Sequence, residues 1–115
     1  MDPAAVHREL REHALAKEGA VEDHPWGDVA WKVKGKMFAV SSENSAKVSV
    51  KSTLEKQAAL VTHPHIEASH YVGRYGWVTI DCQDRDTLDL AKELMDESYA
   101  AIAAKPKRKN NVVTK

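Results

Sequence analysis

DVAWKVKGKMFAVSSENSAKVSVK, residues 28–51, is the stretch that decides the fold. From Val29 to Lys34 apolar residues alternate with alanine and lysine, and a period of two is typical of a half-buried strand. Lys34-Gly35 then interrupts the alternation, and glycine readily adopts the positive φ of a two-residue hairpin turn. The stretch therefore predicts three antiparallel strands, over 29–34, 37–41 and 47–51, with turns at Lys34-Gly35 and at Glu43–Ser45.

Two segments with helical spacing are expected to cover the apolar face that such a meander presents. The first runs from 3 to 17, begins after Asp2 as its cap, and carries its apolar residues on one side. The second runs from 87 to 104 after Asp86 and is long enough to lie across the sheet. The predicted buried positions are Val6, Leu10 and Ala14 in the first helix and Leu88, Ala91, Met95, Ser98 and Ile102 in the second.

The remaining segments predict smaller elements. A short helix is expected over 53–61, capped by Ser52 with Glu55 three residues later, and its inner face is predicted to be Leu54, Ala58 and Val61. A late hairpin is expected to pair 71–72 with 77–82 around a turn at 73–76, leaving 21–27 and 63–69 as loops. The fold class is therefore α+β: a hairpin-rich antiparallel sheet covered on one face by an N-terminal and a long C-terminal helix. We expect one domain over 1–104 and a basic flexible tail over 105–115.

The composition limits the class of protein. A chain of 115 residues suffices for one domain with its own core. Met1 is followed by no apolar run, and no stretch of about eighteen apolar residues occurs, so neither a secretory signal nor a membrane span is expected. Cys82 is the only cysteine, which excludes a disulfide within the chain and fits a reducing cytoplasm. We expect a cytoplasmic monomer that does not contact membranes.

Positive and negative side chains are equal in number, 17 of each, but they are segregated along the chain. Between residues 32 and 51 five lysines accompany one acidic residue, Glu43. Strand parity places several of these lysines, together with Trp77, opposite the apolar face of the sheet. A basic face with an exposed aromatic residue is typical of a surface that holds phosphates and stacks a base. The candidate nucleic-acid-binding residues are Lys32, Lys34, Lys36, Lys47, Lys51, Arg74 and Trp77.

The same lysines have a structural explanation, because every one-sided sheet has a polar face and lysine discourages pairing at sheet edges. Metal binding is not expected, since His63, His65 and His70 do not have the spacing of a metal site. Likewise, Asp89, Glu93, Asp96 and Glu97 are expected to form a solvated face of the last helix rather than a metal-binding ridge. The sequence contains no recognisable catalytic constellation or cofactor motif, so an enzyme is not expected.

Several motifs resemble the MmcQ/YjbR-like family, and together they span nearly the whole chain. They are HPWGD (24–28), WKVKGKMFAV (31–40), VSVK (48–51), YVGRYGWVTID (71–81) and ESYAAIAAKPKRK (97–109). The resemblance implies a frataxin/CyaY-like α+β fold with a double-wing motif, and DNA binding as the function. Many relatives have a lysine, a second basic residue and a histidine before the tryptophan of the late hairpin. Here Arg74 keeps the charge, whereas Tyr75 and Gly76 replace the other two polar groups.

Two functions therefore remain open. The first is a small DNA-binding protein that holds phosphates on the lysine-bearing face of the sheet. The second is a protein-interaction module without catalytic activity that uses the same face or the loop around Trp26.

Overall fold

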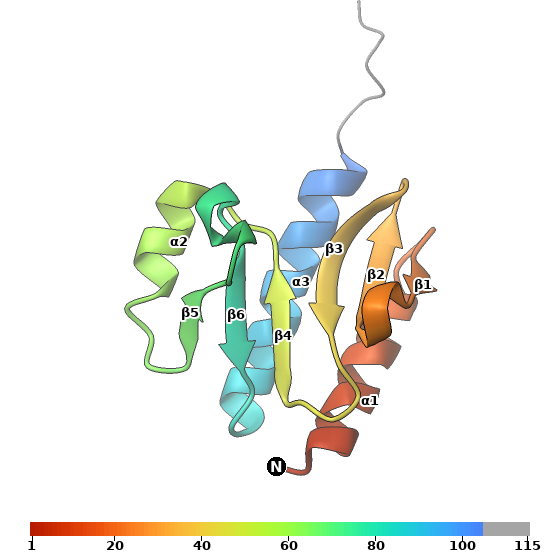
Figure 1. Cartoon of the computed structure of the whole chain (residues 1–115), viewed down its shortest axis with the longest axis horizontal. Coiled ribbons are helices and arrows are strands. Elements are labelled where there is room, and N and C mark those ends of the chain that lie inside the picture. Colours follow the sequence, from red (N-terminus) through yellow and green to blue (C-terminus); the bar gives the residue numbers. More distant parts are fainter. Residues whose placement is uncertain (105–115) are drawn as a thin grey trace, which may run out of the picture.

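The computed structural model describes residues 1–104, and in that range six strands and three α-helices form two layers (Figure 1). The predicted basic tail, 105–115, lies outside the described residues. Two short 3₁₀ turns, η1 and η2, connect neighbouring strands. The elements are α1 (Pro3–Leu15), β1 (Val21–Asp23), η1 (Pro25–Gly27), β2 (Val29–Val33), β3 (Lys36–Ser41), β4 (Lys47–Val50), α2 (Leu54–Leu60), β5 (Ile66–Ala68), η2 (Val72–Tyr75), β6 (Val78–Asp81) and α3 (Arg85–Ala103).

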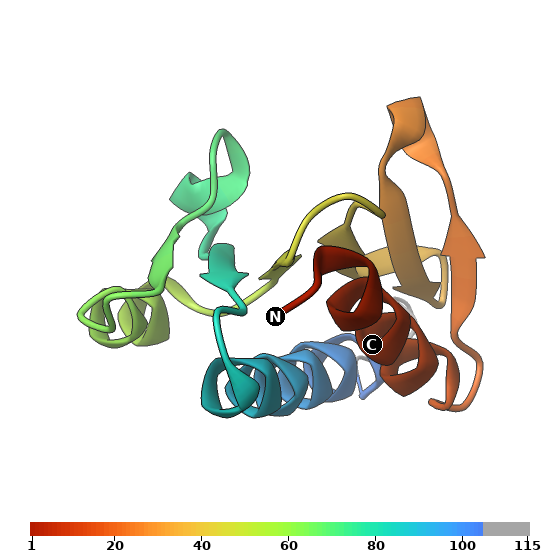
Figure 2. The ribbon, with the colours of Figure 1, turned by 90° about the horizontal axis from the view of Figure 1, so that it is seen from below.

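The strands form one antiparallel sheet in the order β1-β2-β3-β4-β6-β5. Both α1 and α3 lie on one face of it, and η1 and η2 project from the other, which we call the open face (Figure 2). This confirms the predicted α+β class. No helix within residues 1–104 is long and apolar enough to cross a membrane.

The predicted meander is confirmed as β2, β3 and β4. Lys34 and Gly35 both have positive φ, 54° and 77°, as a two-residue hairpin turn requires. A register shift between Trp31 and Lys32 interrupts the pairing of β2 with β3. Opposite this irregularity, the consecutive residues Phe38 and Ala39 are both buried, which strict alternation did not predict.

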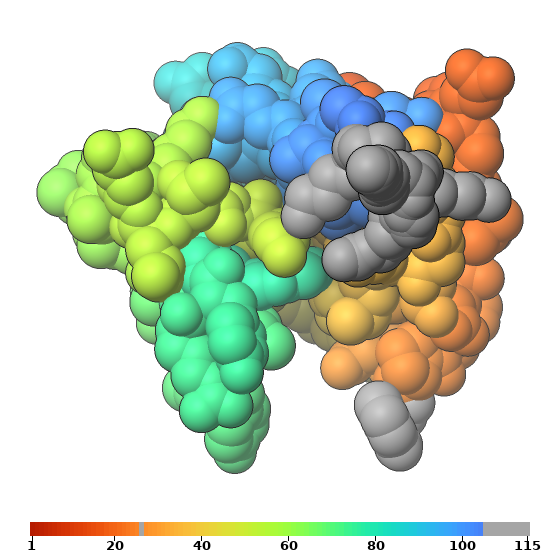
Figure 3. All heavy atoms as spheres, turned by 90° about the horizontal axis from the view of Figure 1, so that it is seen from above, coloured from red at the N-terminus to blue at the C-terminus, as the bar shows by residue number. Residues whose placement is uncertain are grey.

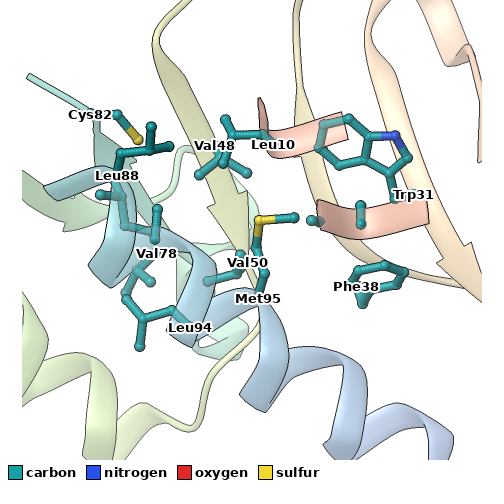
Figure 4. Close-up of a cluster of buried hydrophobic side chains, with 14 of the residues drawn as sticks. Leu10, Trp31, Phe38, Val48, Val50, Val78, Cys82, Leu88, Leu94 and Met95 are labelled. Carbon is teal, nitrogen blue, oxygen red and sulfur yellow. The ribbon is translucent and has the colours of Figure 1, made fainter. Parts of the chain in front are cut away.

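The apolar faces of α1 and α3 close the core, as their spacing predicted. Val6, Leu10 and Ala14 of α1 are inaccessible to solvent, and so is Met95 of α3. All four belong to one buried cluster, and Figure 4 shows Met95 of that cluster between the valines of β4 and the rings of Trp31 and Phe38. The predicted α3 stripe of Leu88, Ala91, Met95, Ser98 and Ile102 is buried in full.

Helix α3 begins two residues before its predicted start, because Asp84 and not Asp86 is its cap. The Asp84 carboxylate accepts a hydrogen bond from the Thr87 backbone N–H at 2.9 Å, and the Thr87 hydroxyl lies 3.0 Å from the Asp84 N–H. These reciprocal bonds form a capping box in which threonine replaces the usual glutamate or glutamine. Asp86 lies in the first turn instead, where a negative charge favours the helix dipole.

Residues 54–76, which comprise α2, β5 and η2, form an outer lobe beyond β6 (Figure 1). Two predictions about its helix are wrong. Thr53 and not Ser52 caps α2, accepting a hydrogen bond from the Lys56 N–H at 3.0 Å. The predicted inner face is exposed, and α2 has no buried residue. Its inner side instead carries the partly buried Leu60, which packs against the core, and Gln57, whose side-chain amide donates to the carbonyl oxygens of Gly73 (2.7 Å) and Trp77 (2.9 Å).

Two strands were assigned to loops by the sequence. Strand β1 lies within the predicted loop 21–27 and β5 within the predicted loop 63–69, and each has only three residues. The late hairpin exists, but β5 and not 71–72 pairs with β6. Three residues are too few for an alternating pattern, so pairing with a neighbouring strand determines these strands rather than their own sequences.

Candidate nucleic-acid interface

The centre of the open face is a row of hydroxyl groups from β4, from β6 and from Ser69, the residue that follows β5. Ser49 of β4 lies opposite Thr79 of β6, and their hydroxyl oxygens are 2.8 Å apart. The Ser69 hydroxyl lies 2.9 Å from the same Thr79 oxygen. Val78 and Ile80 point into the core between them, so the predicted parity of β6 is confirmed.

A hollow of about 520 Å³ lies at one end of this face. Figure 3 shows the molecule hollowed there, between the outer lobe (green) and the segment around η1 and the β2–β3 turn (orange). The hollow brings together four of the seven predicted site residues: Lys32, Lys36, Lys51 and Trp77. The other described residues of its lining are Asp23, Pro25, Gly35, Met37 and Ile102.

The three lysines of the hollow differ in whether their ammonium groups have a partner in the described part of the chain. The Lys32 ammonium group lies 2.8 Å from the Asp23 carboxylate, and this hydrogen bond lowers the pKa of Asp23 below its ordinary value. Within residues 1–104, the ammonium groups of Lys36 and Lys51 form neither an ion pair nor a hydrogen bond. Lys36 and Lys51 are therefore the two cations of the hollow that remain available to an anionic ligand.

A buried serine of α3 fixes the position at which Lys51 leaves the sheet. The Ser98 hydroxyl donates to the Phe38 carbonyl at 2.7 Å and accepts from the Lys51 backbone N–H at 3.2 Å. Ser98 is only 1% exposed, so both bonds are shielded from water. The backbone of Lys51 is thus attached to the core, while its side chain reaches the hollow.

The wall of the hollow on the η1 side is held by Glu22 of β1. One carboxylate oxygen accepts from Arg11 of α1 (2.8 Å) and from the indole N–H of Trp31 (3.0 Å), and the other lies 2.9 Å from a ring nitrogen of His24. Burial raises the pKa of Glu22, but the hydrogen bonds from Trp31 and Arg11 outweigh it and lower that pKa below its ordinary value. Glu22 therefore connects α1 and the core to the segment that bounds the hollow.

Trp77 does not present an exposed ring, and that prediction is wrong. Only 8% of the residue is accessible, although it contributes to the lining of the hollow. The outer lobe holds its backbone, since the Trp77 carbonyl accepts hydrogen bonds from both the Gln57 side chain and the Ser69 N–H. A base stacks on a whole ring face, which Trp77 does not offer.

The other three predicted residues lie apart from the hollow. Lys34 occupies the β2–β3 turn, so the predicted parity with Lys32 fails, and its ammonium group donates to the Ala103 carbonyl at the end of α3 (2.6 Å). Lys47 lines a smaller hollow of about 200 Å³ together with His65, Glu67 and Asp81. Arg74 lies in η2 with its guanidinium group 5.0 Å from the centre of the Tyr75 ring.

Two exposed tyrosines of the outer lobe were missed as candidates. Tyr71 is 94% exposed and Tyr75 is 58% exposed. The sequence placed Tyr71 in a strand, so its side chain was counted with the sheet. The glycines at 73 and 76 were the available signal, because they bracket a turn that leaves neighbouring side chains outside the sheet.

Residues 1–104 contain no cluster of three or more histidine, cysteine, aspartate or glutamate side chains that could hold a metal ion. The carboxylates of α3 form ion pairs instead: Asp96 with His13 and Lys17, and Glu97 with Lys56. Cys82 is buried as predicted, and burial raises the pKa of its thiol to about 12. A thiol with that pKa is a poor nucleophile at neutral pH.

Comparison with known proteins agrees with this architecture. The chain superimposes on the crystal structure of Deinococcus radiodurans protein DR2400, a DUF419 domain, with a TM-score of 0.78 and 24% sequence identity. The match covers 93% of this chain and 85% of DR2400, and at that identity it shows the fold alone. No protein with a curated description matches the chain. The family model YjbR matches residues 15–101, so the chain belongs to the YjbR family.

Proposed function

We propose that this protein binds DNA through the open face, without catalysis, and that Lys36 and Lys51 supply the main phosphate contacts. The observation that carries the proposal is the hollow, where two cations that have no carboxylate partner within residues 1–104 lie beside apolar side chains. A phosphate is the anion that a lysine ammonium group binds readily as a point charge. The family resemblance, which implies DNA binding, supports the same assignment.

The other basic residues would contribute less. Lys32 and Lys34 already have protein partners, so binding a phosphate would require those bonds to break. Lys47 shares its smaller hollow with Glu67 and Asp81, whose negative charges oppose a phosphate there. We therefore expect unequal effects of the predicted lysines, with Lys36 and Lys51 the largest.

A salt titration tests the proposal. Fluorescence anisotropy would follow binding of a labelled DNA to the wild type, to Lys36→Gln and to Lys51→Gln over a range of salt concentrations. Each variant should bind more weakly whatever the DNA sequence, and each lost phosphate contact should reduce the log–log salt slope by roughly 0.7–0.9. Arg8→Gln is the matched control, because Arg8 is exposed on α1 without an ion pair in the described residues. Equal effects of all three substitutions would contradict a localised site.

A second candidate function is protein binding by the outer lobe. Five of the eight exposed large apolar residues described in the structure lie in that lobe: Leu54, Val61, Tyr71, Val72 and Tyr75. Tyrosine and arginine at such a surface are common at protein interfaces. If Lys36→Gln and Lys51→Gln leave DNA binding unchanged, or if the wild type does not bind DNA at about physiological salt, this candidate replaces the first.

A further inference from the structure

The tip of the outer lobe displays two aromatic rings to solvent. Tyr71 has the largest exposed fraction of the exposed large apolar residues in the described structure, and Tyr75 follows four residues later in the same turn. Arg74 lies between them in sequence, with its guanidinium group over the Tyr75 ring. Nothing in the core requires these rings, because neither belongs to the buried cluster or packs against it.

The backbone at Tyr71 has an uncommon conformation. Its φ is 64° and its ψ is −59°, and the N–H of Val72 donates to the His70 carbonyl at 2.6 Å. These values describe a γ-turn with positive φ, which is rare and strained for a residue with a side chain. Strain of this kind persists only where the surrounding structure enforces it, and it is concentrated at functional positions.

The surrounding structure does enforce it. The N–H of Gly73 donates to the Ser69 carbonyl (2.9 Å), and the N–H of Ser69 donates to the Trp77 carbonyl (3.1 Å). The side-chain amide of Gln57 joins the carbonyl oxygens of Gly73 and Trp77 from the side of α2. The two tyrosines therefore extend from a braced turn, which reduces the conformational entropy lost when a ligand binds them.

The same turn lies next to Lys51, one of the lysines of the hollow. Gly76 is so close to the backbone of Ser52 that a Cβ atom on Gly76 would come within 2.3 Å of the Ser52 carbonyl oxygen. Tyr75 precedes Gly76 and Lys51 precedes Ser52, so this contact brings the aromatic turn beside the backbone of Lys51. Trp77, one residue after Gly76, lines the hollow itself.

We infer that Tyr71 and Tyr75 stack on unpaired bases whose phosphates are held by Lys36 and Lys51, so that the protein prefers single-stranded to duplex nucleic acid. The inference rests on the proposed function and adds its substrate class. Exposed aromatic rings beside free cations are what single-strand binding requires, because every base has a face that stacks. A duplex keeps its bases paired and offers the tyrosines only its backbone.

The test compares three labelled probes of about 15 nucleotides, a length within the site size of known single-strand modules. They are a single strand, the corresponding duplex, and an abasic strand that keeps the phosphates but lacks the bases. The proteins are the wild type, the double variant Tyr71→Ala/Tyr75→Ala, the ring-preserving control Tyr71→Phe/Tyr75→Phe, and Lys36→Gln/Lys51→Gln. Thermal melts confirm that each variant is folded, as expected because all four positions are exposed.

The alanine variant should weaken single-strand binding by about tenfold or more and change duplex and abasic binding by less than about twofold. The phenylalanine control should bind like the wild type, whereas the lysine variant should lose affinity for all three probes. Equal binding of the single strand and the abasic strand by the wild type would overturn the inference, as would an alanine variant that binds the single strand normally. If the lysine variant still loses DNA binding in that case, the proposed function stands without base stacking. If the wild type binds no probe, both proposals fail.

Discussion

The part of the molecule in which α1 and α3 cover the sheet, here called the helix-backed part, and the outer lobe both carry apolar residues at helical spacing. They differ in whether those residues are buried. Where α1 and α3 cover the sheet, the apolar stripes predicted from helical spacing are buried completely. In the outer lobe the corresponding stripe of α2 faces solvent, with Leu54 59% exposed. Only Ile66 and the partly buried Leu60 of that lobe reach the core, and the amide of Gln57 adds hydrogen bonds to the carbonyl oxygens of Gly73 and Trp77.

The residues that stabilise the fold are therefore largely different from those that are exposed and available to a partner. Burial of apolar area provides most of the folding free energy, so the helix-backed part determines whether the chain folds. The outer lobe contributes little of that area, which leaves its side chains free for a partner. Substitutions in the two parts should therefore have different consequences, and four pairs of variants can measure the difference.

The largest effect is expected at Met95, in the centre of the core. Met95→Asp places an unpaired carboxylate among apolar side chains and should remove at least about 5 kcal/mol, enough to unfold a domain of ordinary stability. Leu54→Asp introduces the same side chain in the outer lobe, in the first turn of α2, and should change stability by less than about 0.5 kcal/mol. Circular dichroism melts of both variants make the comparison. A similar loss in the two variants would show that α2 packs more tightly than its exposure indicates.

Gly76 tests how firmly the outer lobe is attached. Gly76→Ala combines a φ of +99° with a clash against the Ser52 carbonyl, and we expect a loss of about 3 kcal/mol. Gly35→Ala is the matched control, since its φ is +77° but no atom lies within 4 Å of the added methyl group. That variant should lose only about 1 kcal/mol, the cost of the left-handed conformation alone. Urea denaturation with an unchanged m value would give both numbers, and equal losses would rule out the Gly76–Ser52 contact.

The contrast between the two parts also explains which predictions succeeded. Long elements with many repeats, such as α3, carry enough periodicity for the sequence to identify their buried side. The seven residues of α2 allow only two turns, so the spacing of Leu54, Ala58 and Val61 could not distinguish a buried stripe from an exposed one. Strands β1 and β5 are shorter still and depend on their neighbours in the sheet.

The predictions about the candidate site succeeded and failed for the same reason: local patterns could be recognised in the sequence, whereas contacts between segments could not. The sequence grouped five lysines of the meander on one face, and three of them, Lys32, Lys36 and Lys51, do line the same hollow. Lys34 and Lys47 do not, because Lys34 lies in the β2–β3 turn, where period-two alternation no longer applies, and Lys47 lies at the other hollow.

The sequence could not show that Lys32 has a partner in Asp23, nor that Trp77 is buried, because both depend on contacts between separate segments. The exposed tyrosines were missed because Tyr71 was assigned to a strand; the glycines at 73 and 76 indicated a turn, but not that the turn begins at Tyr71 with a positive φ.

A smaller effect is expected at the ion pairs that join α1 to α3. Hydrogen bonds from Arg85 and Lys92 lower the pKa of Glu9 from 4.5 to about 2. A carboxyl group with a lowered pKa in the folded state stabilises that state above pH 4.5, and this contribution is lost as the pH falls from 4.5 toward 2. Glu9→Gln should therefore reduce stability at neutral pH and converge with the wild type near pH 2.

Urea denaturation at several pH values measures this convergence. Glu12→Gln is the control on the same helix, because Glu12 is exposed and forms no ion pair within residues 1–104. If Glu9→Gln and Glu12→Gln give the same pH profile, the ion pairs with Arg85 and Lys92 do not contribute to folding in solution.

The smallest effect, and the only stabilising one, is expected at Tyr71. Glycine adopts positive φ without the strain that a side chain causes, so Tyr71→Gly should release part of the strain in the γ-turn. The greater entropy of glycine in the unfolded chain offsets some of that gain, which leaves a net stabilisation of about 1 kcal/mol or less. Tyr71→Ala keeps a side chain at the strained position and should show no such gain.

Urea denaturation of both variants, together with single-strand binding, tests this prediction. Both variants should lose affinity for the single strand, but only the glycine variant should become more stable. A glycine variant that is less stable than the wild type would mean that the tyrosine ring contributes to folding. The distinction between a core that stabilises the fold and a lobe that does not would then fail at Tyr71, the most exposed of the large apolar residues described in the lobe.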